Sequence, residues 1–281
     1  TVKRAQRAAR KHLGKKDAPT VRIELRGGTH FLKKPLELGP KDSGWFSMRK
    51  FSIPEVHRPL VFAAYKDEKP ILSGGRTITG WKVGEHKGRT LWTTKLPAVR
   101  KGQWYFRQLW VNGERRYRPQ LPKKGEYQIA ELLDANWEGT WAETVRKGTN
   151  RFGYGDGDLD PNWRNIEDIE LEFRTLWVTI HAKLDRLDTK NRIAYMDRTG
   201  GMRLSRDFHN EGAAYIVKNV FNALEEPGQW YLDRQDGTLY YLPMPGEDPE
   251  TAEVIAPVLE EVVRIEGDHE TSKPVSTIRF E

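Results

Sequence analysis

The densest group of reactive side chains in this sequence lies in one six-residue segment, from Arg206 to Glu211. It contains two carboxylates, Asp207 and Glu211, with the imidazole of His209 between them. Two carboxylates roughly 5–5.5 Å or 6.5–9.5 Å apart can cleave a glycosidic bond, one as acid and the other as nucleophile or base. The segment has no strand periodicity, which is typical of a loop that presents groups to a ligand.

Asp207 and Glu211 are therefore candidate catalytic residues, and Arg206 and His209 are candidate substrate-binding residues. The alternative is a polar loop whose Asp and Asn side chains form turns with their own backbone. With 40 acidic residues in the chain, neighbouring carboxylates arise easily by chance, and we favour this alternative.

Two aromatic residues, Trp141 and Tyr154, lie in a stretch rich in Gly, Asn and Thr. Exposed rings stack on the C–H faces of sugars, so both are candidate substrate-binding residues. Buried rings would instead fill the core of a small β module. The sequence leaves both interpretations open.

Three arginines, Arg115, Arg116 and Arg118, follow a turn signal at Asn112-Gly113. They could clamp a carboxylate or a sulfate, although a solvated hairpin edge is the simpler interpretation. Asp156-Gly-Asp-Leu-Asp160 resembles a calcium loop but lacks the later bidentate Glu, so we favour a turn. The chain has no Cys, and its seven His lack ligand spacing, so we expect neither a metal nor a cofactor.

The composition excludes disorder, because 10 Trp, 10 Tyr and 10 Phe supply apolar surface to bury. The net charge of +7 is spread over interspersed acidic and basic residues. No nucleic-acid motif is present, so an acidic sugar polymer is a better partner than nucleic acid. No apolar run is long enough to span a membrane. Nucleotide-binding and hydrolase-elbow motifs are also missing.

The N-terminal part predicts a capping helix over residues 1–13, ended by Gly14, followed by short strands. The strands are expected at 21–25, 31–38 and 60–65, with a loop over residues 41–59. Residues 77–214 contain many short alternating segments and predict an inserted antiparallel β module. Within this module, residues 169–173 should pair with residues 176–181.

The C-terminal part predicts a helix beginning near Asn219 and a hairpin between residues 230–233 and 239–242. Two alternating segments about 13 residues apart, 262–266 and 275–281, then indicate a β-solenoid that starts to wind. We expect it to continue beyond the chain end, so the predicted domains are 1–76 (cap helix and first coils), 77–214 (module) and 215–281 (helix, hairpin and resumed solenoid).

Six segments in this order resemble large bacterial glycoside hydrolases of the right-handed parallel β-helix type, similar to glycoside hydrolase family 141. They are Arg26-Gly-Gly-Thr-His-Phe-Leu32, Lys69-Pro-Ile-Leu-Ser-Gly-Gly75, Ile78-Thr-Gly-Trp81, Phe106-Arg-Gln-Leu-Trp-Val-Asn-Gly-Glu-Arg115, Glu226-Pro-Gly-Gln-Trp-Tyr-Leu-Asp233 and Gly237-Thr-Leu-Tyr-Tyr-Leu-Pro243. The resemblance implies an all-β fold, a right-handed parallel β-helix carrying an inserted antiparallel module. It also implies that the catalytic carboxylates lie on later coils, outside this segment.

Three functions follow as hypotheses. The first is a secreted or periplasmic glycoside hydrolase that cleaves plant or algal polysaccharide. The second is a polysaccharide lyase on the same scaffold, and the third is a non-catalytic polysaccharide-binding module. The expected partners are a polysaccharide or oligosaccharide and the remainder of the chain's own β-helix, possibly as a second chain or fragment. No nucleic acid and no membrane is expected.

Overall fold

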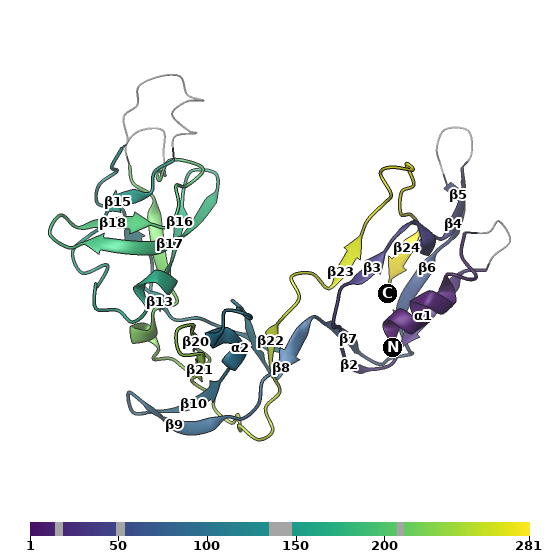
Figure 1. Ribbon diagram of the computed structural model, residues 1–281, viewed down its shortest axis with the longest axis horizontal. Helices are drawn as coiled ribbons and strands as arrows, with labels where there is room; N and C mark the ends of the chain where they lie inside the picture. The colour runs from purple at the N-terminus through teal and green to yellow at the C-terminus, as the bar shows by residue number, and fades with distance from the viewer. Residues whose placement is uncertain (15–18, 49–53, 135–147, 207–210) are drawn as a thin grey trace. The chain divides into compact units, whose positions relative to one another are not determined.

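The computed structural model describes residues 1–14, 19–48, 54–134, 148–206 and 211–281 (Figure 1). The protein is mostly β, as expected, and its sheets are mixed and largely antiparallel. It divides into two compact units: unit 1 is Thr1–Thr77 with Ile255–Glu281, and unit 2 is Ile78–Val254. None of the described helices is long and apolar enough to span a bilayer.

Unit 1 contains the parallel strand pairs. Its elements are α1 (Val2–Ala9), β1 (Val21–Leu25), β2 (Gly28–Phe31), β3 (Leu36–Leu38), η1 (Pro40–Asp42), β4 (Trp45–Met48), β5 (Pro54–Arg58), β6 (Leu60–Ala64), β7 (Pro70–Ser73), β8 (Gly75–Thr77), β22 (Val254–Pro257, which begins at the last residue of unit 2), β23 (Val263–Ile265) and β24 (Ile278–Phe280).

Three sets of strands pair in parallel within unit 1. They are β1 with β6 and β6 with β24, β2 with β7, and β3 with β23. In β6, four of five residues are buried, because it lies between two neighbours and has apolar side chains on both faces. Leu60 and Phe62 of this strand face the unit's core, and Phe62 stacks on Phe280 with 5.2 Å between ring centroids.

The first helix covers this core but is shorter than predicted. It runs over Val2–Ala9, with Thr1 as its N-cap and Arg10 as its C-cap. The side chain of Arg10 binds both oxygens of the fully buried Asp42 at 2.8 Å, and Gln6 donates to the same carboxylate. This anchor holds the helix end against η1.

Residues 41–59 were predicted to be a loop, and this prediction was wrong for two segments. β4 and β5 pair with each other in antiparallel fashion, from Trp45 opposite Arg58. The Gly, Ser and Pro content that suggested a loop reflects a tight approach at the base of this hairpin. A Cβ at Gly44 would lie 2.2 Å from the carbonyl oxygen of Arg58, so only glycine fits there.

Unit 2 is antiparallel and has two main sheets. Its elements are β9 (Lys82–His86), β10 (Arg89–Lys95), α2 (Pro97–Arg100), β11 (Leu109–Val111), β12 (Glu114–Arg116), β13 (Gln120–Leu121), β14 (Tyr127–Gln128), β15 (Arg151–Gly153), η2 (Ile166–Asp168), β16 (Glu170–Arg174), β17 (Thr179–Asp188), β18 (Ile193–Met196), β19 (Ala214–Lys218), η3 (Phe221–Ala223), β20 (Trp230–Asp233) and β21 (Thr238–Tyr241). The smaller sheet has the order β20-β21-β10-β9, and the larger one runs β13-β19-β16-β17-β18-β15, with β14 beside β19.

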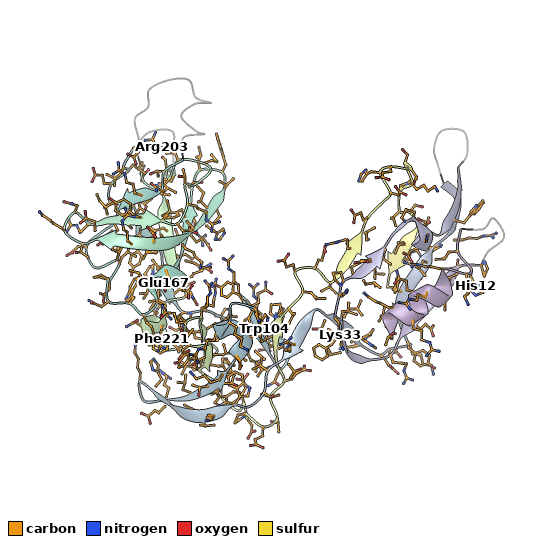
Figure 2. The ribbon with its side chains drawn as sticks, in the orientation of Figure 1. His12, Lys33, Trp104, Glu167, Arg203 and Phe221 are labelled. Atoms are coloured by element: carbon orange, nitrogen blue, oxygen red, sulfur yellow. The ribbon has the colours of Figure 1, made fainter. Side chains whose placement is uncertain are left out.

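Several predicted elements of unit 2 are confirmed. β16 pairs with β17, and β20 forms a hairpin with β21. β11 and β12 are joined by Asn112 and Gly113, which have φ of 52° and 79° and so form the two-residue turn that their residue types predict. Shortly before β11, Trp104 (labelled in Figure 2) packs on Phe106, with ring centroids 4.9 Å apart.

The helix predicted near Asn219 is not formed. Asn219 has a φ of 63°, and its side-chain amide donates to the backbone oxygen of Asp168, so it ends β19 and does not cap a helix. Only the 3-10 turn η3 follows. Unit 2 also continues past residue 214, where the sequence predicted a domain boundary. β19 pairs with β16 and β21 pairs with β10, so unit 2 extends to Val254.

The parallel core of unit 1 generates a stability prediction. Leu60→Ala removes a fully buried side chain and should lower the free energy of unfolding by about 2–5 kcal/mol. Ile71→Ala, at a 55% exposed position of β7, is the matched control and should cost about 0.5 kcal/mol or less. Urea unfolding followed by circular dichroism measures both. Equal losses in the two variants would contradict the placement of the core.

Candidate functional site

The loop singled out from the sequence is described only at its two ends. Ser205 and Gly212 form an antiparallel bridge, and the backbone N–H of Arg206 donates to the carbonyl of Glu211. The side chains of Arg206 and Glu211 form an ion pair of 3.0 Å, and both are about half exposed. Such an exposed pair contributes about 1 kcal/mol or less to stability, so it does not hold either side chain firmly in place. Asp207 and His209 lie outside the described residues.

Of the two aromatic candidates, Tyr154 does not form a surface platform. It is only 4% exposed and packs in the core of the larger sheet with Phe152 and Leu159. Burial raises the pKa of its hydroxyl. This is the core role that the sequence left open, and it follows from the need of a small module for large apolar side chains. Trp141 lies outside the described residues.

The acidic segment at residues 156–160 serves the backbone and the core. Asp158 accepts hydrogen bonds from the N–H of Gly155 at 3.1 Å and from the hydroxyl of Tyr215 at 2.8 Å. Asp160 accepts two hydrogen bonds from Asn162. These are the contacts of a turn. Across the part of the chain that the structure describes, no group of three His, Cys, Asp or Glu side chains is placed to hold a metal ion.

Two of the three arginines bind carboxylates of the protein itself. Arg116 is 8% exposed and contacts Glu247 at 2.6 Å, Glu114 at 2.8 Å and the hydroxyl of Tyr241 at 3.0 Å. Arg118 makes two hydrogen bonds to Glu170, of 2.9 and 2.7 Å. Arg116 and Arg118 therefore bind carboxylates of the chain itself and do not lie on a solvated hairpin edge.

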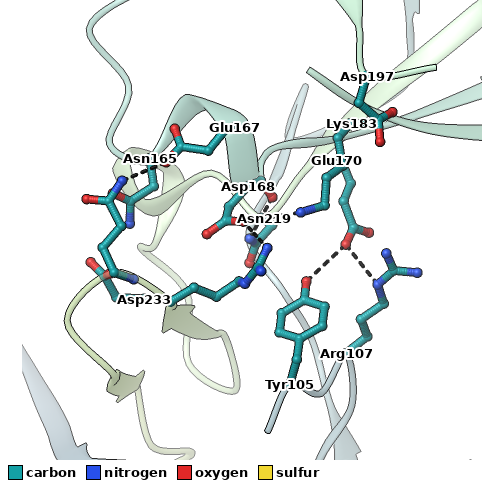
Figure 3. A network of polar contacts seen from close by, with 12 residues as sticks. Tyr105, Arg107, Asn165, Glu167, Asp168, Glu170, Lys183, Asp197, Asn219 and Asp233 are labelled. Atoms are coloured by element: carbon teal, nitrogen blue, oxygen red, sulfur yellow. Dashed lines mark hydrogen bonds and ion pairs between the residues drawn. The ribbon is translucent and has the colours of Figure 1, made fainter. Parts of the chain in front are cut away.

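Glu170 is the centre of a polar network that the sequence analysis did not identify (Figure 3). Besides Arg118, it contacts Arg107 at 3.1 Å and the hydroxyl of Tyr105 at 3.4 Å. Two residues earlier, Asp168 contacts Arg234 at 2.7 Å and Lys183 at 3.3 Å. Both acids are largely buried, and three of the four cations, Arg107, Arg118 and Arg234, lie more than 50 residues away in the sequence.

The same surroundings determine the chemistry of this network. Burial would raise the pKa of Glu170, but the hydrogen bonds and charge of Arg118, together with Arg107, outweigh it and hold the pKa below its ordinary value. Burial and the charge of Glu170 raise the pKa of the Tyr105 hydroxyl. A general acid needs a raised pKa and a free approach to the substrate. Glu170 has neither, so it is not suited to act as a general acid.

The network joins η2 and β16 to the hairpin of β20 and β21. Asn165 donates to the hydroxyl of Tyr231 at 3.0 Å, and Gln235 donates to Glu167 at 2.6 Å. Arg164 pairs with the buried Asp233 at 2.6 Å. No local sequence pattern predicts these pairs, because the two residues of each pair are 65 or more positions apart in the sequence.

Removing the main cation should destabilise unit 2. Arg118→Met leaves Glu170 buried with only Arg107 and Tyr105, and should cost about 2–3 kcal/mol, somewhat less than breaking a fully isolated buried pair. The control is the double variant Arg118→Met/Glu170→Gln, which removes both charges and should recover at least half of the loss. Urea unfolding measures both. No recovery in the double variant would show that Arg118 acts through packing alone.

Glu170 should also make stability depend on pH. Because its folded pKa lies below its ordinary value, near 4.5, its contribution is fully present above pH 4.5 and is lost as the pH falls towards the folded pKa. Between pH 4.5 and 3, the unmodified protein should therefore lose stability more steeply than Glu170→Gln. Unfolding measured across this range tests the difference, and parallel curves would contradict it.

Comparison with known proteins gives a likeness of fold. No family model matches the chain, and no curated protein matches it. A solved structure named "Glycoside hydrolase" is similar over 100% of this chain, with a TM-score of 0.73 and 24% identity. The chain spans 45% of that protein's chain. A second structure, "The complex structure of XylC with xylose", aligns with 93% of this chain and 29% of its own, at 14% identity and a TM-score of 0.27, which carries no argument. The chain thus shares its fold with less than half of a protein named glycoside hydrolase.

Proposed function

We propose that this chain is the N-terminal portion of a secreted or periplasmic bacterial glycoside hydrolase that cleaves plant or algal polysaccharide. One observation carries the proposal: the likeness to the structure named "Glycoside hydrolase" extends over the whole chain at a TM-score of 0.73. Because one fold can host many reactions, the reaction class is tested below by the products that the protein releases.

The strand pairing of unit 1 supports the proposed scaffold, a right-handed parallel β-helix similar to glycoside hydrolase family 141. Val21, Leu60 and Ile278 are successive partners in one parallel sheet, as in stacked coils. The pairs β2–β7 and β3–β23 repeat this relation for the other segments of a coil. Unit 2 enters between β8 and β22, as an insertion into the second coil.

The edges of these parallel sheets support the proposed partner, the remainder of the β-helix, in the same chain or a second one. β24, β7 and β23 each lie at a sheet edge. They carry large exposed apolar side chains: Phe280 at 49%, Ile71 at 55% and Ile265 at 56%. An edge strand with exposed apolar residues is where another strand adds.

The catalytic carboxylates are proposed to lie outside this segment. Among the described residues, Asp168 and Glu170 are bound by cations, Asp158 accepts from Tyr215, and Glu247 accepts from Arg116. Asp207 and Glu211 stay candidates, with Arg206, His209 and Trp141 as candidate contacts to the substrate. A polysaccharide lyase is the second candidate, because the net charge of +7 suits an acidic polymer.

A reducing-end assay on neutral and acidic polysaccharides, with the protein including its later coils, tests the reaction. A hydrolase should release new reducing ends without new ultraviolet absorbance, because hydrolysis forms no double bond. Products that absorb would establish the lyase instead. Neither signal on any substrate of the panel would overturn both enzymatic proposals. Asp207→Asn and Glu211→Gln locate the chemistry: retained turnover places catalysis outside this segment, and loss of more than about 10²-fold places it in the loop.

A further inference from the structure

The hairpin of β11 and β12 has an outward face that no role described so far uses. Trp110 is 38% exposed and Tyr117 is 69% exposed, and Arg115 is exposed as well. In the described part of the chain, neither ring packs on another aromatic ring and neither makes a side-chain hydrogen bond. Exposed aromatic side chains that lie together on one face of a strand pair can form a ligand-binding surface.

The turn fixes how these three side chains lie. The two-residue turn at Asn112-Gly113 places Trp110 directly opposite Arg115. Directly opposed residues on one face have Cβ atoms about 5 Å apart. Tyr117 continues the extended chain two residues after Arg115, held by backbone hydrogen bonds to Gly228 and from Trp230, so it lies on the same face.

The inward face of the hairpin makes this arrangement rigid. Leu109 and Val111 are fully buried on either side of Trp110. Arg116, between Arg115 and Tyr117, is fixed by Glu247, Glu114 and Tyr241. A ligand that met the outward face would therefore not have to order the backbone, which favours binding.

The charge of the face is positive and unpaired. Arg116 and Arg118 bind internal carboxylates, and Glu114, the nearest acid in sequence, is bound to Arg116. Within the described ranges, no carboxylate lies at ion-pair distance from Arg115. A guanidinium between two rings suits a ligand that has an apolar ring face and an anionic substituent, because it binds carboxylate or sulfate through paired hydrogen bonds.

We propose that Trp110, Arg115 and Tyr117 form a binding subsite for an anionic saccharide. The C–H faces of the sugar rings stack on Trp110 and Tyr117, and a carboxylate or sulfate of the sugar binds Arg115. This deepens the proposed carbohydrate activity and rests on it, since it names the class of sugar polymer. A single cation beside two rings binds one anionic substituent next to a sugar ring, whereas nucleic acid is bound mainly through many phosphate contacts.

Titration calorimetry with the 281-residue chain tests the subsite. The probes are oligogalacturonate, a sulfated galactan oligosaccharide and a neutral galacto-oligosaccharide of equal length. Arg115→Gln should weaken the charged probes at least fivefold and leave the neutral one unchanged. Tyr117→Ala and Trp110→Ala should weaken all three. Arg89→Gln and Trp177→Ala, at two other exposed positions, are the matched controls and should leave the affinity for all three probes unchanged. Near-ultraviolet circular dichroism verifies that each variant is folded.

Each outcome of the titrations either supports or overturns the proposed subsite. The charged probe that binds more tightly shows whether Arg115 prefers a carboxylate or a sulfate. An equal loss in Arg89→Gln and Arg115→Gln would overturn the subsite in favour of net charge alone. Tighter binding of a single-stranded oligonucleotide than of any sugar, or no binding of any probe, would also overturn it. Binding is measured without turnover, so the subsite can stand when the hydrolase assay fails, and hydrolysis of a neutral polymer at an unchanged rate in Arg115→Gln would leave the hydrolase standing without the subsite.

Discussion

The organisation of this protein depends on one short antiparallel pairing, between β8 and β22. Gly75 to Thr77 pair with Pro257 to Ile255, and the hydrogen bond from Ile78 to Val254 follows immediately inside unit 2. The chain therefore leaves unit 1 and returns to it at adjacent positions. Because of this closure, β23 can pair with β3 in parallel, as if the long insertion were absent. Gly75 is required there, since a Cβ would lie 2.4 Å from the side chain of Ile255.

Inside the insertion, charge has a structural role that apolar packing cannot fill alone. The larger sheet has a continuous core around Phe152, Phe173 and Tyr215, whose rings contact one another. The segment from η2 to β16 then meets the β20–β21 hairpin through the Arg234–Asp168 ion pair and the hydrogen bond from Gln235 to Glu167. Paired carboxylates of this kind specify how the two segments meet. These polar contacts hold the two segments together.

Local patterns in the sequence predicted local structure well. The alternation in residues 170–173 was sufficient for β16, and Asn112-Gly113 for its hairpin, because a two-residue turn fixes its own register. The same reasoning missed β4 and β5, which are short strands stabilised by each other. It also predicted a helix after Asn219, because Asn219 instead contacts Asp168, which lies 51 residues away in the sequence.

The candidate site shows the same division. The loop from Arg206 to Glu211 was identified from composition, and the structure adds the ion pair that closes its base. The sequence around Tyr154 fitted a surface role and a core role equally well. The packing of strands that are distant in the sequence places Tyr154 in the core. Arg115, Arg116 and Arg118 were found as a group, but alternation and remote partners such as Glu247 and Glu170 determine which one faces solvent.

The length of the turn at Asn112-Gly113 determines which side chains the hairpin presents. Since side chains alternate along a strand, adding or deleting one residue in this turn while β11 keeps its place would turn Arg115 and Tyr117 inward and bring Arg116 to the surface. Point substitutions at positions 110, 115 and 117 leave the register intact. Replacing one side chain at a time therefore changes only the outward face of the hairpin, whereas a change in the length of the turn disrupts both faces at once.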